Sequence, residues 1–386
     1  MIDIAGLPVV DAHCHPFTDA GQLTADQFVD AVSFPGGSVE YMAQGGVPLD
    51  DALMRELKNL RRDVIYLRYL VRQMARFFGC DPTPEQVTAA RNGAVAADYV
   101  GYVRRLYAHC NLAGMVVDFG YPQPPLSVSQ FQQDMPAPVA PVYRIEPLIV
   151  ELLASGAGWE EFRRRYDEAI SAALERGAYA YRGLKSIIAY RTGLEVSPLS
   201  RAPDQGRQSL DAIRRGTGGG AMKRLRDHLL CRALELCIEH GVPMQIHTGV
   251  GDYEVNLVSC RPALLMDLLR FPAFRACTVI LVHGGYPYCG EAGYMANVLP
   301  RVYCDVSQAI PFAGGGARRM FAQILEMAPI SKVVYGSDGF ALLGKRALAQ
   351  ALDDLVAGDL LSPAEATDAA GMVLAETAGR LYGLAG

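Results

Sequence analysis

The sequence lacks several features that mark non-enzymatic or membrane proteins. It contains no dense block of lysine and arginine, and its net charge is −5, so the electrostatic footprint of a nucleic-acid-binding protein is missing. Its apolar runs are far too short to cross a bilayer, and the N-terminus has no basic stretch followed by a sustained apolar one. We therefore expect a soluble, cytoplasmic protein without nucleic-acid or membrane partners.

Cysteine pairs at the spacing of metal or redox motifs are also missing. The nine cysteines are scattered, their number is odd, and none forms a CxxC pair. This usage is typical of reduced thiols in a cytosolic chain. Cys14 stands between two histidines, and strand alternation predicts that its side chain points away from them and serves packing.

What the sequence does contain is ample material for a large α/β core. Hydrophobic residues make up 51% of the 386 residues, enough for one barrel or two ordinary domains. Apolar, β-branched runs bounded by glycine and proline recur eight times. The predicted strands span 7–15, 115–122, 143–150, 181–190, 243–249, 278–287, 301–310 and 332–340. Strands alternating with helices indicate a (β/α)8 TIM barrel over residues 1–386, with its active site at the C-terminal strand ends.

Helical patterns lie between most of these strands. The clearest of them span 159–177, 222–241 and 318–328. Two other segments, rich in proline, glycine and polar residues, are predicted to be loops that are mobile or cover a site: 119–141 and 201–220.

The chain between the first two predicted strands is too long for a simple loop and helix. Apolar residues at three- and four-residue steps predict a helix within 53–79, and Thr83, Pro84 and Gln86 form the start signal of another. We expect a helical insertion over 34–100 that caps the barrel mouth. The arginines expected on its solvated face are Arg61, Arg62, Arg68, Arg72 and Arg76.

Four of the seven histidines fall at the ends of predicted strands. His13 and His15 end the first strand, where a spacing of two puts both side chains on one face. A polar pair without a ligand role is the alternative for an isolated HxH. His247 and His283 end the fifth and sixth strands. The remaining three, which lie on helical patterns and have no expected role, are His109, His228 and His240.

An aspartate and a lysine complete this polar set. Asp338 ends the eighth strand and Lys185 lies in the fourth, so both should reach the same barrel mouth. Imidazole and carboxylate ligands suit zinc, manganese or iron, and a bound divalent metal lowers the pKa of water from about 15.7 toward ~7. Asp338 could hold the metal, accept the proton of that water and pass it to a leaving amine.

The motifs DAHCH, IHTG, VHGGYP and GSDG resemble the metal-binding stretches of the amidohydrolase superfamily of metal-dependent barrels. Within it, GLKSIIAYRTGLEV and PMQIHTGVGD resemble the amidohydrolase-related branch. That branch includes stand-alone metal hydrolases and the N-terminal halves of nodulin-like and fungal developmental proteins fused to a glutamine-synthetase-like domain. The resemblance implies a metal-dependent hydrolase, and it covers nearly the whole chain.

The resemblance also implies a ligand set. Where the superfamily holds two metals, a lysine on the fourth strand forms a carbamate that bridges them, and Lys185 occupies that place. The implied ligands of one Zn2+ ion are His13, His15, Lys185 and Asp338, and those of a second are Lys185, His247 and His283. Mn2+ or Fe2+ is an alternative to Zn2+. With a single metal, Lys185 would instead be a cationic clamp or electrophile, and the two interpretations stay open.

The implied reaction is hydrolysis of a small amide, with Asp338, His283 and Lys185 as the catalytic residues. By analogy with the fused ligase, a γ-glutamyl amide is the first candidate substrate. We expect Arg191 to bind its carboxylate and Glu146 its ammonium group. Gln245 and Tyr286 are further candidates for substrate contact. The alternatives are a carboxy-lyase acting on a small aromatic or unsaturated acid, and a non-catalytic metal-containing barrel with a binding or signalling role. A homo-oligomer is compatible with either enzyme.

Overall fold

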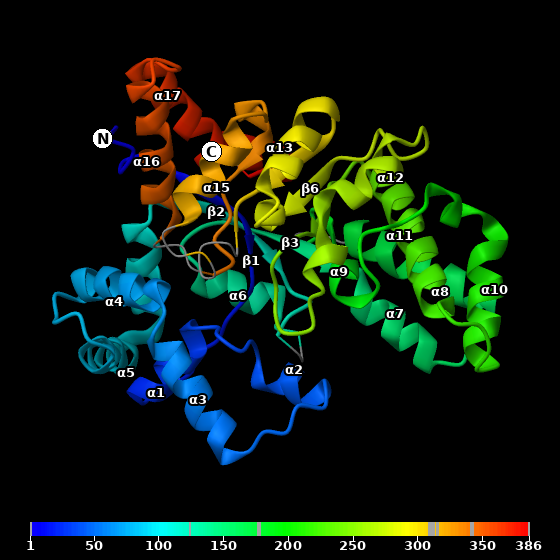
Figure 1. Ribbon diagram of the computed structural model, residues 1–386, viewed down its shortest axis with the longest axis horizontal. Coiled ribbons are helices and arrows are strands. Elements are labelled where there is room, and N and C mark those ends of the chain that lie inside the picture. Colours follow the sequence, from blue (N-terminus) through cyan, green and yellow to red (C-terminus); the bar gives the residue numbers. More distant parts are fainter. Residues whose placement is uncertain are drawn as a thin grey trace.

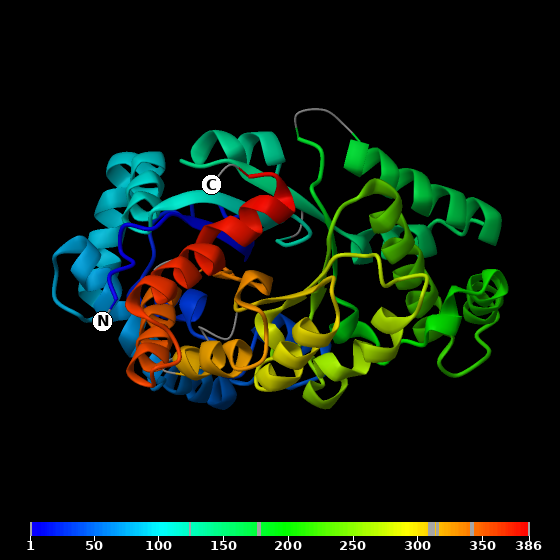
Figure 2. The ribbon, with the colours of Figure 1, turned by 90° about the horizontal axis from the view of Figure 1, so that it is seen from above.

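The computed structural model describes residues 2–122, 125–175, 179–307, 313, 316–339 and 343–384. An eight-stranded parallel sheet runs in chain order from β1 to β8, and helices surround it (Figure 2). The strands are β1 Val9–Cys14, β2 Leu112–Asp118, β3 Val139–Arg144, β4 Leu184–Ser186, β5 Met244–His247, β6 Val279–Val282, β7 Val302–Asp305 and β8 Val333–Val334. The predicted (β/α)8 barrel is confirmed.

The first and last strands meet through hydrogen bonds at the C-terminal end of β1. The amide of Ala12 donates to the carbonyl of Tyr335 over 2.8 Å, and the amide of Asp338 donates to the carbonyl of His13 over 2.9 Å. These bonds bring the barrel close to closure. They also fix Asp338 beside the HxH pair although the two are far apart in sequence.

Helices that follow the strands cover the outside of the barrel. They are α6 Val128–Asp134, α7 Ile145–Ala154, α8 Trp159–Glu175, α9 Ile188–Arg191, α10 Pro203–Arg214, α11 Ala221–His240, α12 Met266–Arg270, α13 Cys289–Val298, α15 Ala317–Leu325, α16 Gly344–Ala357, α17 Pro363–Gly371 and α18 Thr377–Tyr382. Short 3-10 turns and one π-helical turn link them: η1 Pro198–Arg201, η2 Leu257–Cys260, η3 Pro262–Leu265, η4 His283–Gly285, η6 Ile330–Lys332 and η7 Met372–Glu376. None of the described helices has both the length and the apolar character needed to cross a membrane.

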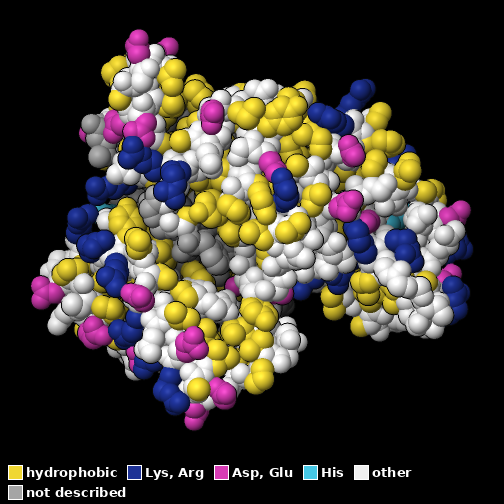
Figure 3. Space-filling model, in the orientation of Figure 1, with side chains coloured by type: hydrophobic (Ala, Val, Ile, Leu, Met, Phe, Trp, Pro, Cys, Tyr) yellow, Lys and Arg dark blue, Asp and Glu magenta, His cyan; other side chains and the backbone are white. Residues whose placement is uncertain are grey.

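Between β1 and β2 the chain forms a separate helical lobe, at the lower left of Figure 1. Its helices are α1 Ala25–Val32, α2 Val39–Gln44, α3 Asp51–Arg62, α4 Ile65–Phe78 and α5 Pro84–His109. The segment 53–79 is thus two helices, broken at Asp63 and Val64. The start signal of α5 is confirmed, since the Thr83 side chain accepts a hydrogen bond from the Gln86 amide. The surface is indented between this lobe and the barrel (Figure 3).

Several local predictions were wrong. The segment 119–141, predicted to be a loop, contains α6 and the first residues of β3. The strand expected at 143–150 ends at Arg144, and the following apolar residues form α7. Ile145, Leu148, Ile149 and Leu152 are buried, and this spacing belongs to a helix rather than a strand. A short apolar run does not by itself show whether the chain follows the repeat of a helix or that of a strand.

The segment 201–220 is not a loop, because it contains α10. Pro203 occupies the first turn of this helix, where proline is tolerated. The buried residues Gly206, Ser209 and Leu210 follow a helical spacing. The glycine has a packing reason, since a Cβ at Gly206 would lie 2.0 Å from the ring of Trp159.

Candidate metal centre

The strand-end residues predicted to bind metal converge on one cavity. This cavity has a volume of about 710 Å³ and lies between the C-terminal strand ends and the helical lobe. The predicted ligands that line it are His13, His15, Lys185, His247, His283 and Asp338. Five of the six come from, or follow, different strands of the barrel, and the HxH motif adds the sixth.

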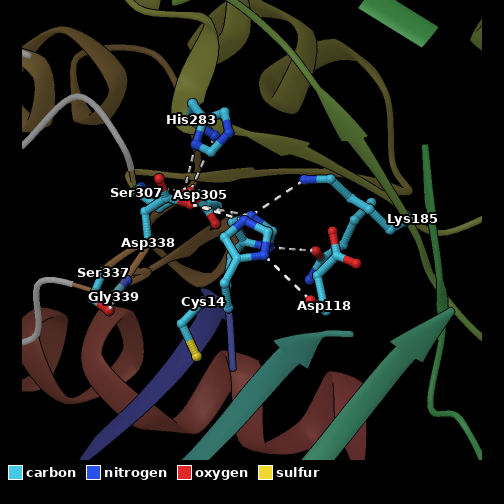
Figure 4. A network of polar contacts seen from close by, with 12 residues as sticks. Cys14, Asp118, Lys185, His283, Asp305, Ser307, Ser337, Asp338 and Gly339 are labelled. Carbon is cyan, nitrogen blue, oxygen red and sulfur yellow. Dashed lines mark hydrogen bonds and ion pairs between the residues drawn. The ribbon is translucent and has the colours of Figure 1, made fainter. Parts of the chain in front are cut away.

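Asp338 contacts both histidines of the HxH pair, and Figure 4 shows it together with His283 and Lys185. Its Oδ1 is 3.5 Å from Nε2 of His13 and 3.6 Å from Nε2 of His15. His13, His283 and Asp338 each offer a ligand atom within 4.8 Å of the others. The rings of His247 and His283 are 4.5 Å apart between centroids. The arrangement is therefore tight enough for a metal to bridge side chains from several strands.

Lys185 reaches the same space from β4. Its Nζ lies 3.3 Å from Nε2 of His13, and the residue is 1% exposed. Burial lowers the pKa of Lys185 to about 8, with Arg144 adding to the effect and Asp118 opposing it. The amine thus has a larger neutral fraction than a lysine in water.

Hydrogen bonds fix the tautomer of each HxH histidine. The Gln245 amide donates to the Ala12 carbonyl and to the Tyr382 hydroxyl, so its oxygen faces His13 and accepts from Nδ1–H over 2.9 Å. Likewise Nδ1–H of His15 donates to the Asp118 carbonyl over 3.2 Å. Nε2 of each ring consequently carries a lone pair, which is the form that can bind a metal; in His13 this nitrogen contacts Nζ of Lys185.

His283 is held in the same way from β7 and the residues after it. Its Nδ1–H donates to Oγ of Ser307 over 2.8 Å, and that hydroxyl donates in turn to Asp305. Asp305 also accepts the backbone amide of His283 over 3.1 Å. Asp305 therefore orients a predicted ligand, which is a structural role.

Burial keeps the histidines neutral. It lowers the pKa of His13, His247 and His283 well below the ordinary value and that of His15 to about 4. Neutral imidazole is the form that binds metals. Burial also raises the pKa of Asp338, with the charge of Lys185 opposing it, and a bound cation would favour the ionised carboxylate.

Two ligand atoms have no hydrogen-bond partner among the described residues. Nε2 of His247 and Oδ1 of Asp338 are both buried and unpaired. A buried polar atom without a partner costs on the order of 1–3 kcal/mol, which a bound cation would relieve. Nitrogen and oxygen donors of this kind fit a divalent transition metal. The residues present therefore fit the predicted metal.

Two of these residues adopt an unusual backbone conformation. His283 has φ of +71° and Asp338 has φ of +54°, in the left-handed region that residues with a Cβ rarely adopt. In both cases the chain turns sharply after a strand, which swings the side chain over the strand ends. Such strain is found at sites where the surrounding structure holds a functional side chain in place.

Cys14 is directed away from the cluster, as predicted (Figure 4). Its thiol contacts the carbonyl of Val116, and the side chain packs with Met115 and Val117. The pairing of β1 with β2 shifts register between Asp11 and Cys14, so the local geometry is not a plain alternation.

The predicted substrate residues separate into two groups. Arg191 lines the cavity and is exposed. Glu146, Gln245 and Tyr286 are absent from the cavity lining. Glu146 is the second residue of α7 rather than part of a strand, and its Oε1 accepts hydrogen bonds from Oγ of Ser186 and from the Ile187 amide. Gln245 lies behind His13, and Tyr286 is part-buried after η4.

Other cavity residues were not predicted. Arg144, Tyr190, Asp252 and Glu254 line the same space. Because the third strand was predicted to run from 143 to 150, Arg144 was not recognised as a strand-end residue, although it is the last residue of β3. The loop acids carried no motif that could single them out.

Arg61 also lines the cavity, and its placement on a solvated face was wrong. It is 7% exposed, and it donates to Asp30 over 3.1 Å and to the Gly37 carbonyl over 2.9 Å. It shares the buried face of α3 with Leu57, four residues earlier. That helical spacing was the available signal.

The chain is similar in sequence to a curated protein and in fold to solved structures. Among curated proteins, protein fluG of Emericella nidulans is 27% identical over 340 residues, which cover 78% of this chain and 38% of fluG. The chain thus spans little more than a third of that relative. A Lactobacillus casei protein, named provisionally as a metal-dependent hydrolase, is 24% identical with a TM-score of 0.79, covering 98% of this chain and 96% of the other. Glucuronate isomerase from Caulobacter crescentus is 17% identical with a TM-score of 0.66, covering 99% and 92%.

At these identities the solved structures show the fold alone. The amidohydrolase family model matches residues 161–384, which is more than half of the chain. The match includes Lys185, His247, His283 and Asp338, while the structure adds the HxH pair from outside it. The chain belongs to the amidohydrolase family.

Proposed function

We propose that this protein is a metal-dependent hydrolase that cleaves the C–N bond of a small amide. The observation that carries the proposal is the position of Asp338. Its buried, unpaired Oδ1 lies within 3.6 Å of both HxH nitrogens, and the residue lines the cavity. Membership of the amidohydrolase family supports a hydrolase in general, and the amide substrate is our extension.

The residues of the chain have distinct parts in this reaction. A divalent cation held by the cluster would polarise the scissile carbonyl and acidify an attacking water. Asp338 accepts a proton from that water and delivers it to the leaving nitrogen. Gln245 and Ser307 hold His13 and His283 with Nε2 facing the cluster. The lobe that contributes Arg61 to the cavity wall limits the size of the substrate.

We extend the proposal to two zinc ions bridged by a carbamate on Lys185. The support is that Lys185 is buried among the predicted ligands and that its lowered pKa favours the neutral amine, the form that reacts with CO2. Elemental analysis of protein purified without chelator tests the ion count and identity. Intact mass under native conditions tests the added carboxylate. One ion and an unmodified lysine would replace this arrangement with a single-metal site in which Lys185 is a cation.

A γ-glutamyl amide remains our first candidate substrate. It is a small amide with an amino-acid end, and the cavity offers both cationic and acidic side chains, Arg191 among the former. With Glu146 away from the cavity lining, the acids of the loop after β5 are better placed to meet an ammonium group.

A substrate panel tests the reaction. The metal-loaded protein is assayed with γ-glutamyl amides, N-acyl amino acids, small lactones and hydroxybenzoic acids, and release of amine, acid and CO2 is measured. Amine release from γ-glutamyl compounds would support the proposal. Release of CO2 alone would establish the carboxy-lyase instead. Absence of turnover in a metal-loaded protein would favour a binding or signalling role.

A further inference from the structure

The cavity beside the metal cluster has walls of opposite charge. Arg144, at the end of β3, and Arg191, at the end of α9, line it on the side of Lys185. Asp252 and Glu254, in the loop after β5, also line it. A cavity with cations and acids on different elements suits a small molecule that carries both charges.

Of these two arginines, Arg144 is held more firmly. Its Nε and Nη2 both donate to the carboxylate of Asp118, with 3.0 Å between Nε and Oδ2, and Asp118 is 0% exposed. The Gly120 amide donates to the same carboxylate over 2.9 Å. Two of the three guanidinium nitrogens are thus fixed, while Nη1 makes no hydrogen bond within the described residues. The pairing with Asp118 uses one edge of the guanidinium and holds the Nη1 side in place for an anionic ligand.

Arg144 also stands next to the reacting groups. It pairs in register with Lys185 on the neighbouring strand, whereas Arg191 lies on an exposed position at the rim. A carboxylate bound by Nη1 would therefore lie close to the metal cluster. Arg191 is less suited to the same task, because its side chain must be ordered from solvent before it can bind.

The acidic side contains an unsatisfied oxygen. Oε2 of Glu254 is buried and has no hydrogen-bond partner among the described residues. Asp252 is close by, and burial together with the charge of Glu254 raises its pKa to about 6. The Asp252 amide donates to the hydroxyl of Tyr190, whose ring packs on His247 at 4.4 Å between centroids. The loop is thus anchored to the cluster, and a ligand ammonium would satisfy the carboxylates.

We infer that the cavity recognises an α-amino-acid group, with Arg144 binding its carboxylate and Glu254 its ammonium. The inference adds to the proposed function by naming the end of the substrate that the protein recognises. It rests on the proposed function only in the identity of the bond that is cleaved. Arg144 and Glu254 are specificity-determining residues in this view. Binding without turnover is sufficient to test them.

The test is calorimetric binding of three probes to the metal-loaded protein. L-Glutamate carries both α-groups, glutarate lacks the ammonium, and 4-aminobutyrate lacks the α-carboxylate. L-Glutamate should bind at least tenfold more tightly than either analogue, which corresponds to about 1.4 kcal/mol. Affinities within twofold of one another, or no binding by any probe, would overturn the inference.

Variants assign the two contacts. Glu254→Gln should abolish the preference for L-glutamate over glutarate and leave glutarate affinity unchanged. Arg144→Lys should abolish the preference over 4-aminobutyrate, while the matched change Arg191→Lys should alter it less than threefold. A larger effect at Arg191 than at Arg144 would refute the assignment.

The comparison of the three probes is made on wild-type protein, so it tests the inference even if Arg144→Lys folds poorly. Amide turnover without zwitterion preference would refute this inference alone, and preference without turnover would refute the proposed hydrolysis alone.

Discussion

At the scale of single residues, Asp338 combines two tasks that a substitution can separate. An asparagine in its place would keep one oxygen for a metal but could not accept a proton. We predict that Asp338→Asn lowers kcat by at least ~100-fold, the usual contribution of general acid–base catalysis. Metal content, measured by elemental analysis of the same preparation, should fall far less than kcat. Unchanged turnover at equal metal content would exclude the hydrolytic role.

Gln245 hydrogen-bonds His13, a predicted metal ligand, and is absent from the cavity lining. Its oxygen fixes the Nδ1–H tautomer of that ring, and loss of such a partner typically weakens metal binding 10–100-fold. We predict this loss for Gln245→Met, measured by chelator competition. Gln245→Glu retains an acceptor for His13 and should recover part of the affinity. Equal affinities for wild type and Gln245→Met would show that the ring needs no such support.

At the scale of elements, replacing two helical glycines by alanine should change the free energy of unfolding in opposite directions. In α10, a Cβ at Gly206 would collide with the ring of Trp159, so Gly206→Ala should destabilise the fold by about 1–3 kcal/mol. In α5, Gly93 has open space around its Cβ position, and Gly93→Ala should stabilise by about 0.5–1 kcal/mol. Denaturant unfolding of both variants measures the difference. A Gly206→Ala variant as stable as the wild type would contradict the packing described for α10, and a destabilised Gly93→Ala variant would contradict the open space described at that position of α5.

The sequence predicted elements well where the pattern was long. Eight runs and their intervening helices indicate the barrel, and the HxH spacing marks the end of β1. It failed at 143–150, where a short apolar run indicates a strand although Ile145, Leu148 and Ile149 follow the helical spacing, and this error concealed Arg144. The prediction also failed at 201–220, because Pro203 and the glycines near the end of this segment are typical loop signals, although α10 begins at Pro203 and ends before those glycines.

The convergence of the predicted ligands on one cavity was predictable because these residues lie on or just after strands, and strand ends meet in a barrel. The residues proposed to bind the substrate were not predictable in this way. Gln245 shares a strand with His247, yet only the fold shows that it supports His13 from behind. Glu254 lies in a loop without a motif, and a loop conformation is set by tertiary contacts that a single sequence does not reveal.

At the scale of the whole molecule, the barrel should fold without metal but gain stability from it. The core that surrounds the strands is apolar and extensive, so chelator-treated protein should keep its secondary structure by circular dichroism. Binding only to the folded state stabilises by RT ln(1 + [M]/Kd), about 4 kcal/mol at a thousandfold excess over Kd. The melting temperature should therefore fall on chelation and return with added Zn2+.

A matched control separates metal binding from side effects of the chelator. The double variant His283→Ala, Asp338→Ala removes two of the three members of the tight His/His/Asp group together with their donor atoms, and its melting temperature should respond to Zn2+ far less than that of the wild type. Wild-type protein that unfolds completely on chelation would show that the core is insufficient alone. A wild-type melting temperature that does not respond to Zn2+ would contradict the metal site itself, because the buried, unpaired atoms of His247 and Asp338 would then be satisfied in another way.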